Sequence, residues 1–222
     1  MEPAMKCAES TLRLYAVTDR AWTENRTLAE QVEDALRGGA TCVQLREKQM
    51  ERAAFLAEAR EICALCRRYG VPFLVNDNLD VALACGADGV HLGQDDMTIS
   101  EARRRAGEAF LIGATAHTVE EAVEAEREGA DYLGCGAVFG SATKTDASAM
   151  TFETLQSICR TVSIPVVAIG GVTLQNLPLL AGSGAAGVAV VSALFAAPDI
   201  CEAAKALRAA SEEMARGSAP PG

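Results

Sequence analysis

The sequence repeats one local pattern four times: a helical segment ends in Gly-Ala, and a short apolar run follows at once. The pairs begin at Gly39, Gly86, Gly129 and Gly184, at intervals of 47, 43 and 55 residues. Glycine is common in the left-handed position that ends a helix, and a short apolar run is typical of a buried strand. Each interval is too long for one strand–helix unit and is long enough for two.

A second set of strands is predicted between the repeated ones, at residues 12–19, 72–77, 110–117 and 165–171. Helical patterns separate the strands. They cover residues 27–37, 51–69, 100–106, 119–128, 152–161 and 199–216, with shorter ones at 78–85 and 176–181. The strand runs are apolar almost throughout, as expected of parallel strands that helices cover.

The alternation of eight strands with eight helices predicts an α/β fold. The even repeat favours a closed barrel over an open doubly wound sheet, because the edges of an open sheet would differ from its middle. We therefore predict a single (β/α)8 TIM barrel, for which a chain of 222 residues is long enough. No linker divides the chain, so we expect one domain over residues 1–222, with residues 1–10 and 217–222 frayed.

Composition limits the partners and the cellular compartment expected for such a barrel. The net charge of −10 argues against general nucleic-acid binding, because phosphate backbones favour positive surfaces. No run approaches the ~20 consecutive apolar residues that cross a bilayer, and the N-terminus has no apolar signal-peptide core. We therefore expect a cytoplasmic protein that binds neither membrane nor nucleic acid. No oligomeric state is predicted.

The sequence contains eight cysteines, several of them inside apolar runs. This placement is typical of buried thiols in a reducing compartment. Cys63 and Cys66 form a Cys-x-x-C pair within a predicted helix, but no second pair completes a zinc site. A structural role is therefore the favoured interpretation of the pair.

In a (β/α)8 barrel the chemistry lies at the carboxyl ends of the strands, so polar residues there are candidates. The second predicted strand ends in Gln44-Leu45-Arg46-Glu47-Lys48. Period-two alternation predicts that Gln44, Arg46 and Lys48 lie on one side, where they can bind an anion. A solvated strand end without function is the alternative.

Carboxylates follow the next two strands. The third predicted strand ends in Asn76-Asp77, and the fourth is followed by Asp95-Asp96. Carboxylates on adjacent strand ends can share a hard cation such as Mg2+, which prefers oxygen ligands. The alternative is that these aspartates only cap the helices that follow them.

The remaining strand ends carry hydroxyls, glycines and one lysine. Thr115, at the end of the fifth strand, can donate to a phosphate, whereas His91 and His117 are expected to be structural. The loop at residues 140–149 can wrap an anion or close over the barrel mouth. Gly171 and Ser192 follow the last two strands, where barrels of this kind often bind phosphate. Two anion sites suit a reaction that joins a diphosphate to a monophosphate.

Five motifs resemble, in their order and spacing, those of the thiamine phosphate synthase family. They are residues 44–48, 76–77, 89–96, 143–145 and 169–172. The resemblance runs from Tyr15 to Ala193. It implies a transferase with an Mg2+ cofactor. Such an enzyme joins an aminopyrimidine diphosphate to a thiazole phosphate, plain or carboxylated, and releases thiamine phosphate and pyrophosphate.

The resemblance also implies a role for each candidate residue. Asp77 and Asp96 would be the Mg2+ ligands, and Arg46, Lys48 and Lys144 the catalytic cations. The residues implied to bind substrate are Gln44, Leu45, Arg46, Glu47, Lys48, Asn76, Thr115, Ser141, Ala142, Thr143, Lys144, Gly171, Val191 and Ser192.

Two positions depart from the family pattern. The family often has Ser in place of Thr115, and often Pro-Thr in place of Gly140-Ser141. Neither change removes a chemical group that the reaction needs. Three alternatives stay open: a thiazole tautomerase on the same barrel, another phosphate-handling barrel such as a sugar-phosphate epimerase, and a non-catalytic ligand sensor.

Overall fold

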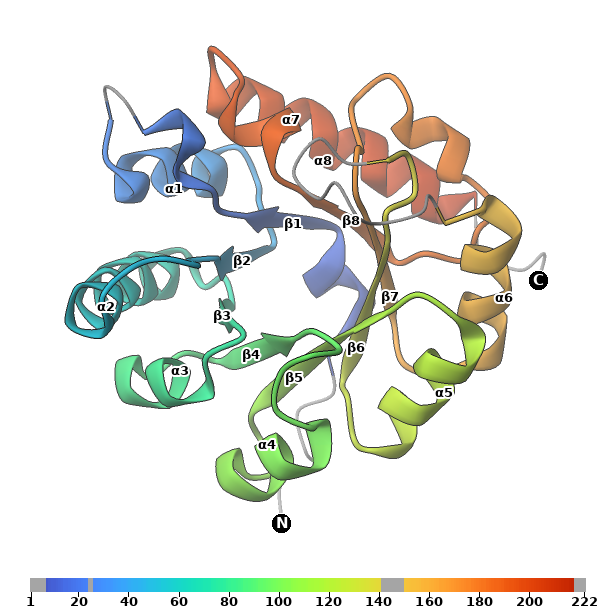
Figure 1. Cartoon of the computed structure of the whole chain (residues 1–222). Coiled ribbons are helices and arrows are strands. Elements are labelled where there is room, and N and C mark those ends of the chain that lie inside the picture. The colour runs from blue at the N-terminus through green and yellow to red at the C-terminus, as the bar shows by residue number, and fades with distance from the viewer. Residues whose placement is uncertain (1–6, 24–25, 141–149, 218–222) are drawn as a thin grey trace.

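The computed structural model describes residues 7–23, 26–140 and 150–217. In this part of the chain eight parallel strands close into a barrel, in which each strand pairs with the next and β8 pairs with β1 (Figure 1). The strands are β1 Leu14–Val17, β2 Cys42–Leu45, β3 Phe73–Asn76, β4 Gly89–Leu92, β5 Leu111–Ala116, β6 Tyr132–Gly136, β7 Val166–Ile169 and β8 Gly187–Val190. The predicted (β/α)8 fold is confirmed, and the open doubly wound sheet is excluded.

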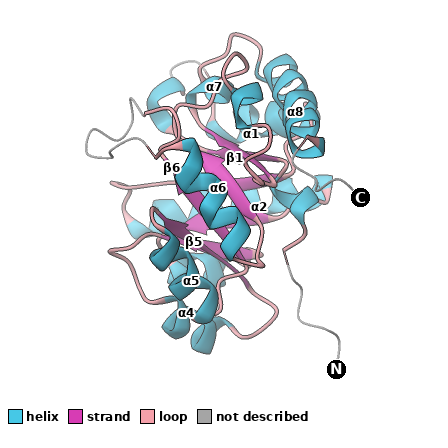
Figure 2. Cartoon of the chain, turned by 90° about the vertical axis from the view of Figure 1, so that its right-hand side faces the viewer, coloured by secondary structure: helices cyan, strands magenta, loops and turns pink. Residues whose placement is uncertain are grey.

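Helices follow the strands and cover the outside of the barrel (Figure 2). The α-helices are α1 Leu28–Arg37, α2 Arg52–Tyr69, α3 Leu79–Cys85, α4 Ile99–Ala106, α5 Val119–Arg127, α6 Phe152–Thr161, α7 Ser192–Phe195 and α8 Ile200–Arg216. Among the helices of the described residues, none is long and apolar enough to cross a membrane.

Short 3-10 helices occur as well. They are η1 Glu9–Leu12, η2 Arg20–Trp22 and η3 Leu177–Leu180. The helix predicted at residues 176–181 forms only η3. Pro178 lies in the first turn of η3, where its missing backbone N–H removes no helical hydrogen bond.

The glycines of the sequence repeat lie where a helical segment gives way to a strand. Gly39, Gly86, Gly129 and Gly184 have φ angles of 101°, 74°, 99° and 89°. Residues with a Cβ rarely adopt such angles, which explains why glycine recurs there. The four glycines precede β2, β4, β6 and β8, so the repeat corresponds to every second strand.

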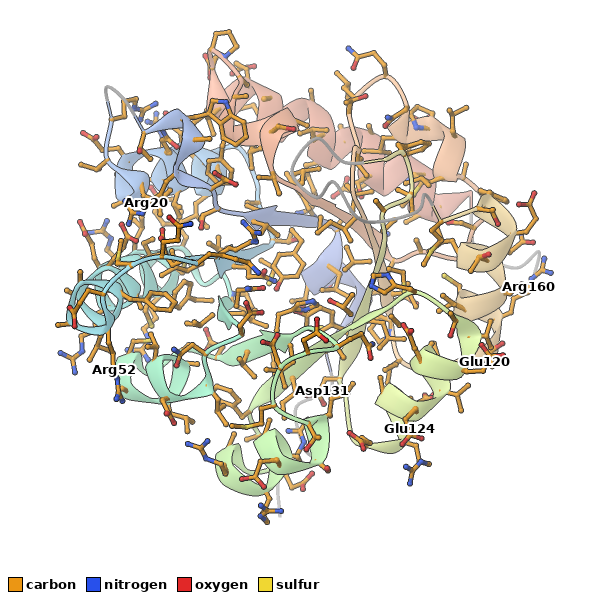
Figure 3. The ribbon with its side chains drawn as sticks, viewed as in Figure 1. Arg20, Arg52, Glu120, Glu124, Asp131 and Arg160 are labelled. Carbon is orange, nitrogen blue, oxygen red and sulfur yellow. The ribbon has the colours of Figure 1, made fainter. Side chains whose placement is uncertain are left out.

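Side chains of each strand alternate between the inside of the barrel and the layer under the helices. On β3, Leu74 belongs to the interior cluster, while Phe73 and Val75 pack toward the helices, and all three are fully buried. Charged side chains such as Arg52, Glu124 and Arg160 lie instead on the outer surface of the helices (Figure 3).

The amino-terminal end of the barrel is filled by η1 and the residues before it. Leu12 is fully buried, and Cys7 belongs to the same interior cluster. Gly187 comes so close that a Cβ there would lie 2.0 Å from the Leu12 carbonyl oxygen. Cys7 is therefore packed at this end of the barrel, whereas residues 8–10 are exposed. Gly217 caps the end of α8.

None of the eight cysteines, all of which lie in the described residues, forms a disulfide. Cys63 and Cys66 are buried in α2, and Cys63 Sγ lies 3.4 Å from the Gly86 carbonyl oxygen. Burial raises the pKa of the Cys66 thiol to about 12. These contacts agree with the structural interpretation of the Cys-x-x-C pair.

Candidate active site

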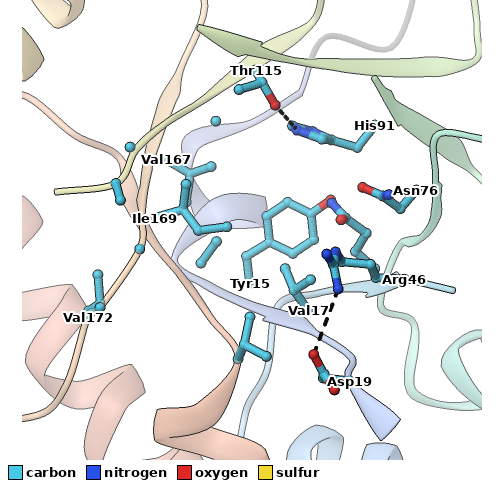
Figure 4. A pocket seen from close by; sticks show the side chains of 18 of the residues that line it. Tyr15, Val17, Asp19, Arg46, Asn76, His91, Thr115, Val167, Ile169 and Val172 are labelled. Carbon is cyan, nitrogen blue, oxygen red and sulfur yellow. Dashed lines mark hydrogen bonds and ion pairs between the residues drawn. The ribbon is translucent and has the colours of Figure 1, made fainter. Parts of the chain in front are cut away.

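A pocket opens at the carboxyl ends of the strands, and Figure 4 shows the side chains that line it. Residues from β1 through β8 contribute to its wall. The predicted site residues among them are Gln44, Arg46, Asn76, Thr115, Gly171, Val191 and Ser192. Predicted positions from five separate stretches of the sequence, between residues 44 and 192, therefore meet in one cavity.

The floor of the pocket carries two buried amides. Gln44 is 5% exposed, and its Nε2 donates to the Tyr15 hydroxyl over 2.8 Å. Asn76, the last residue of β3, is 8% exposed. Amides at such depth offer both a donor and an acceptor to a ligand.

Two cations follow β2: Arg46 lines the pocket, and Lys48 lies beside Asp77 rather than in the pocket wall. The Arg46 guanidinium lies 3.7 Å from the Asp19 carboxylate, a contact drawn in Figure 4. The Arg46 backbone N–H donates over 3.0 Å to the buried hydroxyl of Thr18, which holds the strand end in place. Lys48 Nζ lies 3.7 Å from Asp77 Oδ2. Both cations therefore have carboxylate partners while their heads remain accessible to an anion.

Asp77 has an unusual backbone conformation, with a φ of 62°. A non-glycine residue there costs of order 1–3 kcal/mol, and such residues cluster at functional sites. The Asp77 N–H donates to the His91 carbonyl over 2.8 Å, which ties the residue to β4. The Asn78 side chain, not that of Asp77, accepts from the Val81 N–H and caps α3. The helix-cap alternative for Asp77 is therefore wrong.

Asp96 follows β4 and is turned back toward the strand end. Its Oδ2 accepts from the Gly93 N–H over 2.7 Å, and Thr98 caps α4 in its place. Burial and the neighbouring Asp96 carboxylate raise the pKa of Asp77 to about 6, whereas Lys48 and Arg46 act to lower it. The two predicted metal ligands therefore lie close enough to interact strongly.

This pair of carboxylates fits Mg2+. Two adjacent acidic groups that repel each other gain from a divalent cation between them, and Mg2+ commonly uses one or two carboxylates together with water and substrate phosphates. Within residues 7–23, 26–140 and 150–217, no group of three or more His, Cys, Asp or Glu side chains forms a fuller metal cage.

Two residues of the predicted substrate-binding set have side chains that do not line the pocket. The Leu45 side chain is fully buried in the core under the helices. Glu47 Oε1 lies 2.6 Å from Arg20 Nε, and the Glu47 side chain is 5% exposed. The same alternation that turns Gln44 and Arg46 into the pocket turns these two side chains away from it. The Leu45 and Glu47 side chains therefore lie outside the pocket wall, and a substrate contact at these positions stays a prediction.

The wall formed by β7 and β8 is mostly apolar and ends in a glycine pair. Gly170 and Gly171 have φ angles of 98° and 66°. A Cβ on Gly171 would lie 2.1 Å from the Gly140 carbonyl oxygen, so only glycine fits where the loops after β6 and β7 meet. Asn176 Nδ2 donates to the Gly171 carbonyl over 2.9 Å and fixes the turn.

Other predicted loop residues, namely Ser141, Ala142, Thr143 and Lys144, lie outside the described residues.

Some pocket residues were not predicted. Tyr15, Val17 and Asp19 come from β1 and the residues just after it. The alternation rule that selected Gln44 and Arg46 would have found them, had it been applied to the first strand. His117 lines the pocket as well, and its Nδ1 lies 2.9 Å from the Gly136 carbonyl oxygen.

A closed α/β barrel with cations, carboxylates and amides gathered at the carboxyl ends of its strands defines a class, the TIM-barrel enzymes that act on small anionic substrates. A family model described as thiamine monophosphate synthase matches residues 14–194. The chain belongs to this family, as the sequence motifs predict, and it is an enzyme of the transferase class.

Relatives of known sequence and structure agree with this assignment. The thiamine-phosphate synthase of Ruminiclostridium cellulolyticum is 46% identical over 194 residues, which cover 87% of this chain and 92% of that protein. That of Chloroflexus aurantiacus is 50% identical over 198 residues, 89% and 91% of the two chains. The structure of a thiamine phosphate pyrophosphorylase from Pyrococcus furiosus matches with a TM-score of 0.86 at 42% identity, covering 93% of this chain and 98% of that one.

Proposed function

We propose that the pocket binds an aminopyrimidine diphosphate and a thiazole phosphate, joins them into thiamine phosphate and releases pyrophosphate. One observation carries the proposal: two cations and two carboxylates meet at the ends of adjacent strands. Lys48 lies 3.7 Å from Asp77, and Asp96 and Arg46 act on the same Asp77 carboxyl group. A diphosphate with a divalent cation has the charges that complement this set.

The two ends of the pocket suit the two substrates. The buried amides of Gln44 and Asn76 can bind the edge of the pyrimidine, while Arg46 and Lys48 bind its diphosphate. Gly171, Val191 and Ser192 line the opposite wall and can receive the thiazole phosphate. Lys144 and residues 141–143 complete the predicted substrate-binding set and lie outside the described residues.

Asp77 and Asp96 would hold an Mg2+ ion, which when bound neutralises charge on the leaving pyrophosphate. Arg46 and Lys48 add to that neutralisation through the protein's own groups, and they are already oriented by Asp19 and Asp77 before substrate binds. Such preorganised charges lower the barrier because they need no rearrangement as the leaving group develops its charge.

The chemical step that we propose is a dissociative substitution. The bond from the pyrimidine CH2 group to the diphosphate oxygen breaks, and both electrons leave with pyrophosphate. The electron-rich aminopyrimidine stabilises the resulting cation, and the thiazole nitrogen then donates its lone pair to that carbon. The protein's part is to hold the two substrates in contact and to exclude water, so no strong base or covalent nucleophile is needed.

We also propose a reducing, cytoplasmic setting. All eight cysteines are unpaired, and burial raises the pKa of thiols such as Cys66 and Cys159 to about 12. Unpaired buried thiols are typical of proteins that are not exposed to an oxidising compartment.

The test is an assay with the purified full chain, Mg2+ and both phosphorylated precursors, in which thiamine phosphate and pyrophosphate should form in equal amounts. Lys48→Ala should lower kcat by about 10²–10³-fold, as removal of other preorganised charge stabilisers does. Lys205→Ala is the matched control, because both lysine side chains are 55% exposed and ion-paired, but Lys205 lies on α8.

Near-normal turnover of the Lys48 variant would remove Lys48 from the catalytic set. Rearrangement of the thiazole phosphate without coupling would favour the tautomerase alternative. Binding of either precursor without any turnover would favour the ligand sensor.

A further inference from the structure

A continuous chain of hydrogen bonds crosses the inside of the barrel below the pocket. The Gln44 amide donates to the Tyr15 hydroxyl over 2.8 Å, and the two hydroxyls of Tyr15 and Tyr132 lie 2.7 Å apart. The Tyr132 hydroxyl lies 3.0 Å from His91 Nδ1, and His91 Nε2 lies 3.1 Å from the Thr115 hydroxyl. The chain therefore joins a residue of β2 to a residue of β5 through β1, β6 and β4.

Two glycines leave room inside the barrel for the side chains of this hydrogen-bond chain. A Cβ on Gly113 would lie 2.1 Å from Tyr132 Cζ, so a larger residue on β5 would displace the phenol ring. A Cβ on Gly134 would lie 3.0 Å from His91 Cε1. Glycines on neighbouring strands thus leave room for the phenol and for the imidazole, which indicates that the chain has a defined place in the core.

The direction of the chain follows from counting protons. Burial raises the pKa of Tyr15 and of Tyr132 well above the usual value, so each phenol keeps its single proton. The Tyr15 oxygen accepts from Gln44, and its own proton goes to the Tyr132 hydroxyl, 2.7 Å away, rather than to the neighbouring Cys42 thiol, because sulfur is a weak acceptor. Tyr132 then donates to His91 Nδ1, because its hydroxyl proton would otherwise have no acceptor among the described residues.

We propose that these five side chains act as one directional unit, which fixes His91 as the Nε2–H tautomer and makes the Thr115 hydroxyl a donor toward the substrate. His91 Nε2–H donates to the Thr115 oxygen, and the Thr115 proton is left for the pocket that Thr115 lines. The substrate atom facing Thr115 is then an acceptor, a phosphate oxygen or a ring nitrogen. This second part rests on the proposed assignment of Thr115 to the substrate.

Tyr132 is in this view a positioning residue, since it acts on the substrate only through His91 and Thr115. If the donor and acceptor of one hydrogen bond were exchanged and the others kept their direction, two protons or two lone pairs would face each other at a contact inside the barrel. A mismatch of that kind disfavours the reversed chain by roughly tenfold or more.

The test is the tautomer of His91, measured by 15N NMR of the full chain without ligand at pH 8. The chain has only two histidines, and the other one is an internal reference. His117 Nδ1 meets a carbonyl oxygen, which can only accept, so His117 should be the Nδ1–H tautomer. The wild-type protein should therefore show one histidine of each tautomer, and a His117→Gln variant assigns the two rings.

Tyr15→Phe is the decisive variant. It removes the hydrogen bond that Tyr15 donates to Tyr132, and it does so without changing any residue in contact with His91. Tyr132 can then either donate to the imidazole or accept from it, so His91 should become a mixture of tautomers. Tyr69→Phe is the matched control, since the Tyr69 hydroxyl bonds to Glu33 outside the barrel and should leave both rings unchanged.

Each outcome decides the proposal. An Nδ1–H tautomer of His91 in the wild-type protein would overturn it without any variant. An unchanged His91 in a folded Tyr15→Phe protein would overturn the coupling along the chain. If Thr115→Val keeps normal kcat and KM while the tautomers behave as expected, the directional chain stands and only the substrate contact of Thr115 is wrong.

Discussion

Asp77 combines three features that belong to single residues rather than to the fold: a left-handed backbone at a non-glycine position, a half-buried carboxyl group, and a second carboxylate beside it. Each of these costs free energy in the absence of a cation. Lys48 and Arg46 offset part of that cost, but they do not return the carboxyl group to its ordinary pKa. The residue is therefore poised to gain from a divalent cation.

The affinity for Mg2+ should depend on pH through Asp77. With a pKa of about 6 in the metal-free protein, Asp77 is protonated below pH 6 and cannot ligate the ion. Affinity should be nearly constant above pH 7 and should fall by up to about tenfold per pH unit below 6, as one proton competes with the metal. Calorimetric titration of the full chain with Mg2+ alone, at several pH values, measures this.

Asp77→Asn is the control for that titration. The variant should bind Mg2+ weakly at every pH and should lose the steep dependence between pH 5 and about 7. A wild-type affinity that stays flat across this range would contradict the assignment of Asp77 as a ligand.

At the scale of the elements, period-two alternation explains both what the sequence predicts and what it misses. At the end of β2, alternation predicts Gln44, Arg46 and Lys48 on one side, and the first two line the pocket while Lys48 does not. The family resemblance also implied Leu45 and Glu47, whose side chains point away. The contact of Tyr15 with Tyr132 joins strands that are 117 positions apart in sequence, so no local pattern reveals it.

The turn after β7 offers a prediction at the same scale. Gly171→Ala should raise the KM for the thiazole phosphate by tenfold or more, because the new Cβ would lie 2.1 Å from the Gly140 carbonyl oxygen and would push two loops of the pocket apart. Mg2+ affinity, which depends on β3 and β4, should be unchanged. Steady-state kinetics with each substrate varied in turn measures the effect.

Gly70→Ala is a matched control for that variant. Gly70 has a φ of 65°, close to the 66° of Gly171, yet no atom lies within 4 Å of the Cβ that it would gain. Both variants carry the same backbone strain, so only crowding distinguishes them. Equal effects of the two substitutions on KM would show that Gly171 matters for stability and not for the phosphate site.

At the scale of the whole molecule, the two ends of the barrel differ: the end at the amino termini of the strands is filled by apolar side chains, and the end at their carboxyl termini carries the pocket. Cys7 and Leu12 fill the interior at the amino-terminal ends of the strands, while the polar groups gather at the carboxyl ends. The repeat of Gly-Ala pairs predicts the closed barrel, because similar copies indicate strands in similar surroundings, whereas an open sheet has edge strands that differ from its central ones. The packing of Cys7 and Leu12 into the barrel leaves no such signal, because the residues between them include Glu9, Ser10 and Thr11 and form no apolar run.

The central claim is that residues from three adjacent strand ends surround one diphosphate–magnesium unit. A crystal structure of the full chain with inorganic pyrophosphate, and with Mn2+ in place of Mg2+, tests it most directly through the anomalous signal of the metal. We predict one metal site bridging the Asp77 and Asp96 carboxylates, with pyrophosphate oxygens in hydrogen-bond contact with Arg46 and Lys48. A metal bound away from both carboxylates, or pyrophosphate bound without either cation, would contradict the account.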